Sequence, residues 1–365
     1  MALHTQEVTE IAQNIAKEGE TIAVTQIGEG TNGVGFRISF TNAENQTRTY
    51  FVKTLSPNGF GNEFAPARLK SMTEATVPYE HSIPVHAVLA LDEDGKILGN
   101  LINLSEAVTI SQILPDDAKN VLEKLRSPEL TLEEVKTTAA LMAQTMVDIH
   151  SAETYEGDNA QAVYDRSTRS IIHNEELTPG VWDFLRQQNP TWITSEEYAL
   201  FVQNMILTRE SIDSDADRMT RVQGDYWAAN MFTSSEGIHV TDSRTVWGEP
   251  AIDASWMIGE FCMQNLLRFG QFAGPITNAV WDEIQHYQDM RNDWELTAHM
   301  ALPYAFQTFA EATFTPDLSD EQRRTLFLAG FGGLLAAQKG RSFSAEHLDT
   351  YVNIAQDSIN NLTER

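Results

Sequence analysis

The stretch from Val222 to Phe232 constrains the fold more than any other part of the chain. A short apolar run ends at Gly224, and a carboxylate, Asp225, follows at once. An amide, Asn230, comes five residues later, and a second acid, Asp242, lies twelve residues beyond it at the end of a strand-like segment. Two strand-like segments joined by a short turn bring their outer ends together. We therefore expect Asp225, Asn230 and Asp242 to converge on one point.

Carboxylate and amide side chains in this arrangement suit the transfer of a phosphoryl group. The carboxylate of Asp225 can accept the proton of a hydroxyl group. The amide oxygen of Asn230 and the carboxylate of Asp242 are ligands that Mg²⁺ prefers, and such an ion bridges the phosphates of a nucleotide. The three residues therefore predict a phosphoryl-transfer site with a magnesium centre.

The segment 223–230, Gln-Gly-Asp-Tyr-Trp-Ala-Ala-Asn, resembles the catalytic loop His-Gly-Asp-x-x-x-x-Asn of the aminoglycoside phosphotransferase and choline kinase superfamily. Members of that family are small-molecule kinases with a protein-kinase-like fold. Asp242 and the segment 247–253 resemble the family's metal-binding Asp and the Gly-Asp-Pro-x-x-Asp segment after it. Two positions depart from the pattern. Gln223 replaces the usual His, and Ser243-Arg244 follow where the family often has an acid or an aromatic residue. Because a Gln side chain both donates and accepts hydrogen bonds, we interpret its presence as tolerated.

The resemblance covers roughly residues 22–256 and implies transfer of the γ-phosphoryl group of ATP to a hydroxyl group of a small acceptor. Asp225 would be the catalytic base, and Asn230 and Asp242 would hold Mg²⁺. ATP and Mg²⁺ are the implied cofactors. The motifs leave the acceptor open among aminoglycosides, amino alcohols, sugars and homoserine-like metabolites. A nucleotide-binding pseudoenzyme of the same fold, acting as a sensor or scaffold, is the alternative that Gln223 raises.

Glycines recur between two strand-like segments, 21–27 and 36–40. A dinucleotide-binding fold, and with it an NAD-dependent oxidoreductase, would need a helix directly after the glycines. The alternation from Phe36 onward predicts a strand, which favours a kinase-type loop over the phosphates, although a simple Gly-rich hairpin has the same pattern. The resemblance implies that four glycines cover the nucleotide phosphates: Gly28, Gly30, Gly33 and Gly35.

Lys53 lies in a third, otherwise apolar strand-like segment, 50–55. A Lys in a half-buried strand is costly unless its charge is paired, although an edge Lys that faces solvent avoids this cost. The resemblance implies that Lys53 contacts the α- and β-phosphates and an acid on the next helix, which we expect over 62–75. Glu63 and Glu74 are both candidates for that acid, and we favour Glu63.

The predicted fold class is α+β, a protein-kinase-like bilobal fold. Residues 1–105 would form a small lobe with an antiparallel sheet and a helix, with further strands over 83–92 and 97–104 and a connection between lobes near 100–107. Residues 106–365 would form a larger, mainly helical lobe that carries the catalytic loop, the metal site and the acceptor site. Apolar periodicity predicts helices over 5–18, 130–150, 194–211, 254–269, 276–291, 298–314 and 321–338. Gly330, Gly332 and Gly333 would permit close helix contact.

Composition limits the partners. The net charge of −27 argues against nucleic acid and anionic membranes, and it is compatible with a cationic acceptor, although a generally acidic, soluble surface explains it more simply. No apolar run approaches the ~20 residues that span a bilayer, and residues 1–20 lack the apolar centre of a signal peptide. The single cysteine, Cys262, is expected to be buried. We therefore expect a cytoplasmic protein, and its oligomeric state stays open.

Overall fold

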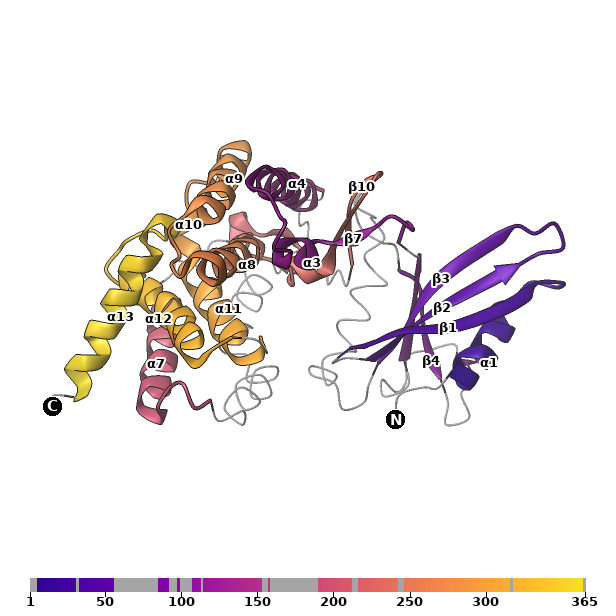
Figure 1. The fold of residues 1–365 in the computed structure, drawn as a ribbon, viewed down its shortest axis with the longest axis horizontal. Helices are drawn as coiled ribbons and strands as arrows, with labels where there is room; N and C mark the ends of the chain where they lie inside the picture. The colour runs from indigo at the N-terminus through magenta and orange to yellow at the C-terminus, as the bar shows by residue number, and fades with distance from the viewer. Residues whose placement is uncertain are drawn as a thin grey trace. The chain divides into compact units, whose positions relative to one another are not determined.

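The computed structural model describes residues 5–30, 33–55, 85–91, 97–98, 107–112, 114–152, 157, 190–211, 216–241, 246–315 and 318–363. They separate into two units, Met1–Ala118 and Lys119–Arg365 (Figure 1). The boundary predicted between residues 105 and 106 lies outside the described residues, as does the predicted helix over 62–75.

The first unit contains an antiparallel sheet whose strand order is β1-β2-β3-β6-β4-β5. Its strands are β1 (Thr21–Gly30), β2 (Gly33–Thr41), β3 (Thr47–Leu55), β4 (Val85–Leu91), β5 (Ile97–Leu98) and β6 (Ala107–Gln112). The first three strands follow one another as the alternating segments predict. Strand β6 was not predicted, and it lies between β3 and β4 by pairing with both.

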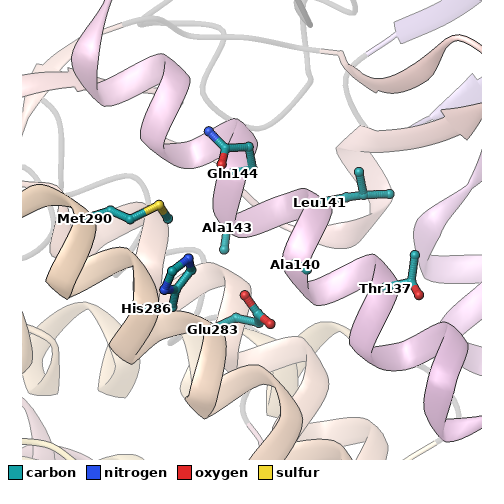
Figure 2. A pocket seen from close by; sticks show the side chains of 8 residues that line it. All are labelled: Thr137, Ala140, Leu141, Ala143, Gln144, Glu283, His286 and Met290. Carbon is teal, nitrogen blue, oxygen red and sulfur yellow. The ribbon is translucent and has the colours of Figure 1, made fainter.

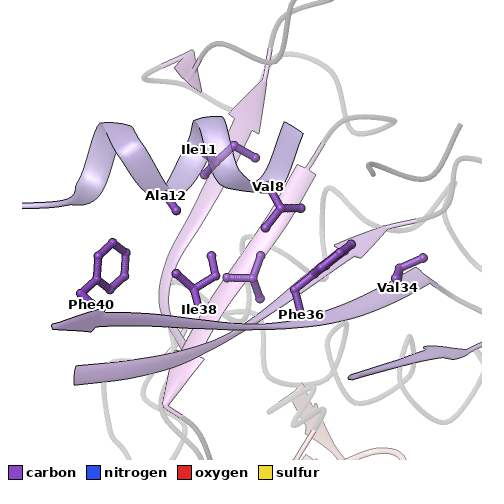
Figure 3. Packing of buried hydrophobic residues seen from close by; sticks show 8 residues of the cluster. Val8, Ile11, Ala12, Val34, Phe36, Ile38 and Phe40 are labelled. Atoms are coloured by element: carbon purple, nitrogen blue, oxygen red, sulfur yellow. The ribbon is translucent and has the colours of Figure 1, made fainter. Parts of the chain in front are cut away.

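One face of this sheet is covered by helix α1 (Thr5–Ile15), as Figure 3 shows. The helix places apolar residues three or four positions apart on one side, whereas β2 buries every second residue. The resulting core consists of Val8, Ile11, Ala12, Val34, Phe36, Ile38, Phe40 and Val52. All of these side chains are 5% exposed or less, so the helix and the sheet share a continuous apolar layer.

The second unit is mainly helical. It comprises β7 (Lys119–Asn120), α3 (Val121–Arg126), α4 (Leu132–Ser151), α7 (Ser195–Ser211), β8 (Thr220–Val222), β9 (Met231–Ser234), β10 (Gly237–Val240), β11 (Val246–Gly248), α8 (Ala251–Phe269), α9 (Pro275–Arg291), α10 (Leu296–His299), α11 (Ala301–Phe314), α12 (Asp320–Ala337) and α13 (Leu348–Thr363). The helices predicted in this unit are present within a few residues of their expected bounds, and the one over 298–314 is divided at Met300. None of the described helices combines the length and the apolar character of a membrane-spanning segment.

Aromatic side chains fill the centre between α7, α11 and α12. Phe201 stacks on Phe309 with ring centroids 5.3 Å apart, and Phe327 packs against both rings. All three side chains are fully buried. These ring contacts hold α7, α11 and α12 together.

Helices α12 and α13 approach so closely that one position must lack a side chain. A Cβ atom at Gly332 would lie 1.9 Å from the backbone oxygen of Tyr351 on α13. A Cβ atom at Gly330 would lie 2.2 Å from Oγ1 of Thr308, whereas one at Gly333 would meet nothing closer than 3.9 Å. The predicted close helix contact therefore depends on Gly332 toward α13 and on Gly330 toward α11, and Gly333 contributes nothing to it.

A charged network joins the start of α8 to the chain before β8. The Glu249 carboxylate, 2% exposed, lies 2.8 Å from the guanidinium of Arg218, which also contacts Asp293. His299 approaches the same carboxylate at 3.4 Å. Burial opposes ionisation of Glu249, but His299 and Arg218 outweigh it and lower the pKa of the carboxyl to about 2.

We expect Gly332→Ala to lower the free energy of unfolding by about 3 kcal/mol, because the added methyl group collides with the backbone of α13. Gly333→Ala, its neighbour on the same helix, should raise the free energy of unfolding by up to about 1 kcal/mol through helix propensity. Urea unfolding followed by circular dichroism measures both. Equal effects of the two substitutions would contradict the packing of α12 on α13.

The network of Glu249 predicts an acid-dependent loss of stability. Because the pKa of Glu249 is lower in the folded protein than its usual value of 4.5, its contribution is complete above that value and declines as the pH falls toward 2. The contribution of Glu249 to the free energy of unfolding should decrease by about 3 kcal/mol over this range. Unfolding free energies measured from pH 6 to pH 2 should show the difference between wild type and Glu249→Gln shrinking over this window; a constant difference would rule out the ionised form as the stabilising species.

Candidate functional site

The predicted catalytic loop lies between strand β8 and the hairpin of β9 and β10. Strand β8 pairs with β11, and the chain then passes through Asp225 and a short 3-10 turn, Ala228–Asn230, into β9. The hairpin pairs Met231 with Val240. The two strand-like segments therefore do bring their outer ends together, as the sequence predicts.

Asp253, in the first turn of α8, holds the backbone of this loop. Its fully buried carboxylate accepts hydrogen bonds from the backbone N–H groups of Gln223 at 2.7 Å and Gly224 at 2.9 Å. Gly224 has a φ of 77°, a conformation that a side chain would strain, so glycine is required at this turn. The turn places Asp225 directly after a backbone that is fixed at two points.

His150, near the end of α4, is a buried partner of Asp253. Its Nε2 atom lies 2.9 Å from the Asp253 carboxylate, and its Nδ1 atom lies 2.5 Å from the Tyr287 hydroxyl. The backbone oxygen of His150 accepts a hydrogen bond from the Thr220 hydroxyl on β8. His150 thus connects α4, β8, α8 and α9.

Gln223, the departure from the family pattern, has a fully buried side chain that hydrogen-bonds to backbone groups on both sides of the loop. Its Oε1 atom accepts from the backbone N–H of Asp225 at 2.5 Å. Its Nε2 atom donates to the backbone oxygen of Thr241 at 3.3 Å. The amide therefore links the catalytic loop to the end of β10, using the donor and the acceptor that a single Gln side chain offers.

Asn230 and Asp225 are brought together. The Nδ2 atom of Asn230 donates to the backbone oxygen of Asp225 at 3.0 Å. The backbone oxygen of Asn230 accepts from the N–H of Thr241 at 2.8 Å and from its hydroxyl at 3.0 Å. Asp242 lies outside the described residues, but the residue before it is thus bonded to Asn230. Across the described residues, no three His, Cys, Asp or Glu side chains are grouped as metal ligands.

Two further residues anchor the loop and were missed from the sequence. Tyr226 is fully buried and donates from its hydroxyl to the backbone oxygen of Met142 on α4 at 2.6 Å. Burial raises the pKa of Tyr226 well above its usual range, which keeps the hydroxyl a donor. Asn120 on β7 donates to the backbone oxygen of Ala229 at 2.8 Å. Only tertiary structure reveals these roles, because Tyr226 occupies an unspecified position of the motif and Asn120 lies outside it.

The first unit carries the glycines and Lys53. The sequence predicts a glycine-rich loop between a strand that ends at Ile27 and one that begins at Phe36. The glycines instead extend both strands, with Gly28 opposite Gly35 and Gly30 opposite Gly33. Strand β2 contains Gly33 and Gly35 and continues to Thr41, so a strand occupies the position where a dinucleotide-binding fold requires a helix. On β3, Lys53 pairs through its backbone with Gly35. Glu63 and Glu74 lie outside the described residues.

A separate pocket of about 570 Å³ lies on the second unit between α4 and α9 (Figure 2). Gln144 and Leu141 of α4 and Glu283, His286 and Met290 of α9 are among its lining residues. Leu141 is 39% exposed and Met290 41% exposed, so the pocket is open to solvent. None of the predicted site residues lines it.

Comparison with solved structures finds kinases of small molecules. Plasmodium vivax ethanolamine kinase superposes with a TM-score of 0.50 at 11% identity, covering 94% of this chain and 85% of the kinase. Choline kinase from Cryptosporidium parvum also gives a TM-score of 0.50 at 11% identity, covering 99% of this chain and 97% of the kinase. No protein-family model and no curated protein sequence matches the chain. At this identity the likeness shows the fold alone: the chain has the α+β, protein-kinase-like fold of these two kinases, as the sequence predicts.

Proposed function

We propose that this protein is a small-molecule kinase that transfers the γ-phosphoryl group of ATP to a hydroxyl group of a small acceptor. The observation that carries the proposal is the construction of the catalytic loop. Asp253 and Gln223 fix the backbone on the N-terminal side of Asp225. Asn230 holds the backbone oxygen of Asp225 from the other side. A carboxylate carried on a backbone that is fixed from both sides suits a base that must meet one hydroxyl group.

Asp225 is the proposed catalytic base. Its side chain is half-buried, so it can reach an acceptor while remaining less solvated than a surface acid. It would orient the acceptor hydroxyl and take its proton as the new phosphate ester bond forms. The half-buried position also strengthens the electrostatic interactions of the carboxylate.

Asn230 and Asp242 are the proposed ligands of Mg²⁺. An amide oxygen and a carboxylate match the hard oxygen ligands of this ion. Asn230 is 9% exposed and is oriented by its own Nδ2 hydrogen bond, which supports a fixed ligand over a mobile one. When bound, the Mg²⁺–ATP complex would supply the phosphoryl group and neutralise charge on its oxygens.

The first unit would bind the nucleotide phosphates. Lys53 would contact the α- and β-phosphates, with Glu63 as the acid that orients it. The backbone of the glycines, at positions 28, 30, 33 and 35, would cover the phosphates. The register that pairs Lys53 with Gly35 supports this assignment, because it places the Lys backbone on the strand next to the glycines.

We expect Asp225→Asn to lower kcat by about 10²- to 10⁴-fold while ATP binding persists, because the amide cannot take the hydroxyl proton. The measurement is magnesium-dependent, acceptor-stimulated ADP release with a panel of amines, sugars and amino alcohols, beside ATP titration calorimetry. Asp289→Asn, a change to an exposed acid on α9, is the control and should retain full activity. ATP binding without turnover in wild type across the panel would favour the pseudoenzyme, and no ATP binding would end the kinase proposal.

Asp253 is proposed as a positioning residue that acts through the loop backbone. Asp253→Asn removes the charge from an acceptor of two backbone N–H groups, and each such bond to a charged group contributes about 1.5–3 kcal/mol. We expect kcat to fall about tenfold or more with the KM for ATP nearly unchanged, and the unfolding midpoint to decrease. Steady-state kinetics below that midpoint separate the two effects; unchanged kcat in folded protein would refute the positioning role.

A further inference from the structure

The side chain of Asn120 uses both ends of its amide group. Its Oδ1 atom accepts hydrogen bonds from the backbone N–H groups of Leu122 at 3.0 Å and Glu123 at 3.3 Å, which caps the N-terminus of α3. Its Nδ2 atom donates to the backbone oxygen of Ala229 at 2.8 Å. Capping needs only an acceptor, and Ser or Asp would supply one equally well. The Nδ2 donor is therefore a separate feature of this side chain, and it is directed at the catalytic loop.

The acceptor of this bond belongs to the peptide unit that precedes Asn230. The carbonyl group of Ala229 and the N–H group of Asn230 lie in one plane, because rotation about the peptide bond is restricted. The N–H group donates to the backbone oxygen of Trp227 at 3.0 Å within the 3-10 turn, and the carbonyl group accepts from Asn120. This peptide plane is thus held at both of its polar groups.

The peptide unit on the other side of Asn230 is held as well. Its carbonyl oxygen accepts from the N–H group of Thr241 at 2.8 Å and from the Thr241 hydroxyl at 3.0 Å. Two rigid peptide planes meet at each Cα atom, and their orientations together set the direction of its Cα–Cβ bond. Asn120 therefore helps to aim the Asn230 side chain, although it lies 109 positions before Ala229 and outside the motif.

The position of Asn120 beside the loop is itself fixed by the fold. Strands β7 and β9 pair in a register that sets Asn120 opposite Phe232. The ammonium group of Lys124, in α3, donates to the Thr233 hydroxyl on β9 at 3.2 Å. At the other end of α3, Arg268 of α8 donates to two backbone oxygens at 2.6 Å each. The chain around Asn120 is thus tied to the hairpin on one side and to α8 on the other, so its bond to the loop is built into the fold.

We propose that Asn120 is a positioning residue for the phosphoryl-transfer site, and that it orients Asn230 through the peptide unit between Ala229 and Asn230. The inference rests on the proposed kinase activity, in which Asn230 supplies an amide oxygen to Mg²⁺. This ion demands nearly ideal octahedral geometry, so a ligand that loses its fixed direction binds it less well. The effect of Asn120 falls on metal-dependent steps and leaves the binding of metal-free nucleotide intact.

Two substitutions separate the donor of Asn120 from its cap. In Asn120→Asp the carboxylate keeps an oxygen that caps α3, but a second oxygen replaces the donor and faces the carbonyl group of Ala229. Asn120→Ser also keeps a capping oxygen, lacks the amide donor and adds no charge, so it controls for the charge of the first variant. Glu123→Gln, an exposed change in the first turn of the same helix, is the matched control and should bind and turn over like wild type.

The measurement is titration calorimetry of the full chain with AMP-PNP, a nonhydrolysable ATP analogue, in excess Mg²⁺ and again in excess EDTA. We expect Mg²⁺ to increase the affinity of wild type for the analogue. Asn120→Asp and Asn120→Ser should each reduce this Mg²⁺-dependent gain about tenfold, with the affinity in EDTA within about twofold of wild type. In acceptor-stimulated ADP release, the Mg²⁺ concentration that gives the half-maximal rate should rise in both variants.

A Mg²⁺-dependent gain that is unchanged in both variants would overturn the inference, as would an equal loss of affinity with and without Mg²⁺. If Asn120 served only to cap α3, both variants would keep the metal dependence of wild type, because both keep the cap. Failure of the proposed function shows in wild type itself, as nucleotide binding that is absent or indifferent to Mg²⁺, and that result would overturn the inference together with it. The two failures are therefore distinguishable.

Discussion

The hydrogen bonds from Gln223 and Gly224 to the Asp253 carboxylate are the contact on which the candidate site depends. A buried carboxylate is costly unless donors surround it, and here two backbone N–H groups and the His150 ring do so. The same bonds stabilise the left-handed turn at Gly224, which reverses the chain before Asp225. One set of hydrogen bonds thus offsets both the desolvation of the Asp253 carboxylate and the strain of the turn at Gly224. The position of the proposed base depends on a residue 28 positions further along the chain.

Much of this arrangement could be predicted from the sequence. Short motifs singled out the loop from Gln223 to Asn230, whose catalytic role stays a prediction. The alternation of apolar residues located β1, β2 and β3, because that signal is local. The periodicity of the helices was equally clear, although α13 escaped notice despite buried residues at Leu348, Tyr351 and Ala355. The predicted resemblance to kinases of small molecules holds at the level of the fold.

What the sequence did not reveal depends on contacts between distant segments. Strand β6 pairs with β3, which lies more than fifty residues earlier in the chain, and with β4. No local sequence pattern indicates that β6 inserts between these two strands. The roles of Tyr226 and Asn120 are hydrogen bonds to backbone oxygens, which any residue could supply. The burial of Glu260 and Glu311 was missed for a related reason: they lie on separate helices, and in the sequence each alone resembles an ordinary surface acid.

The strand β7 has a consequence for how the protein can be dissected. It begins at Lys119, the first residue of the second unit, and pairs at once with β9 of the catalytic hairpin. Cutting the chain between Ala118 and Lys119 would keep this strand with its hairpin and leave β6 within its own sheet. A cut at residue 105 would instead remove β6 from between β3 and β4 and attach it to a fragment with no partner for its edges. The natural place to separate the two units therefore lies directly before the strand that supports the catalytic loop.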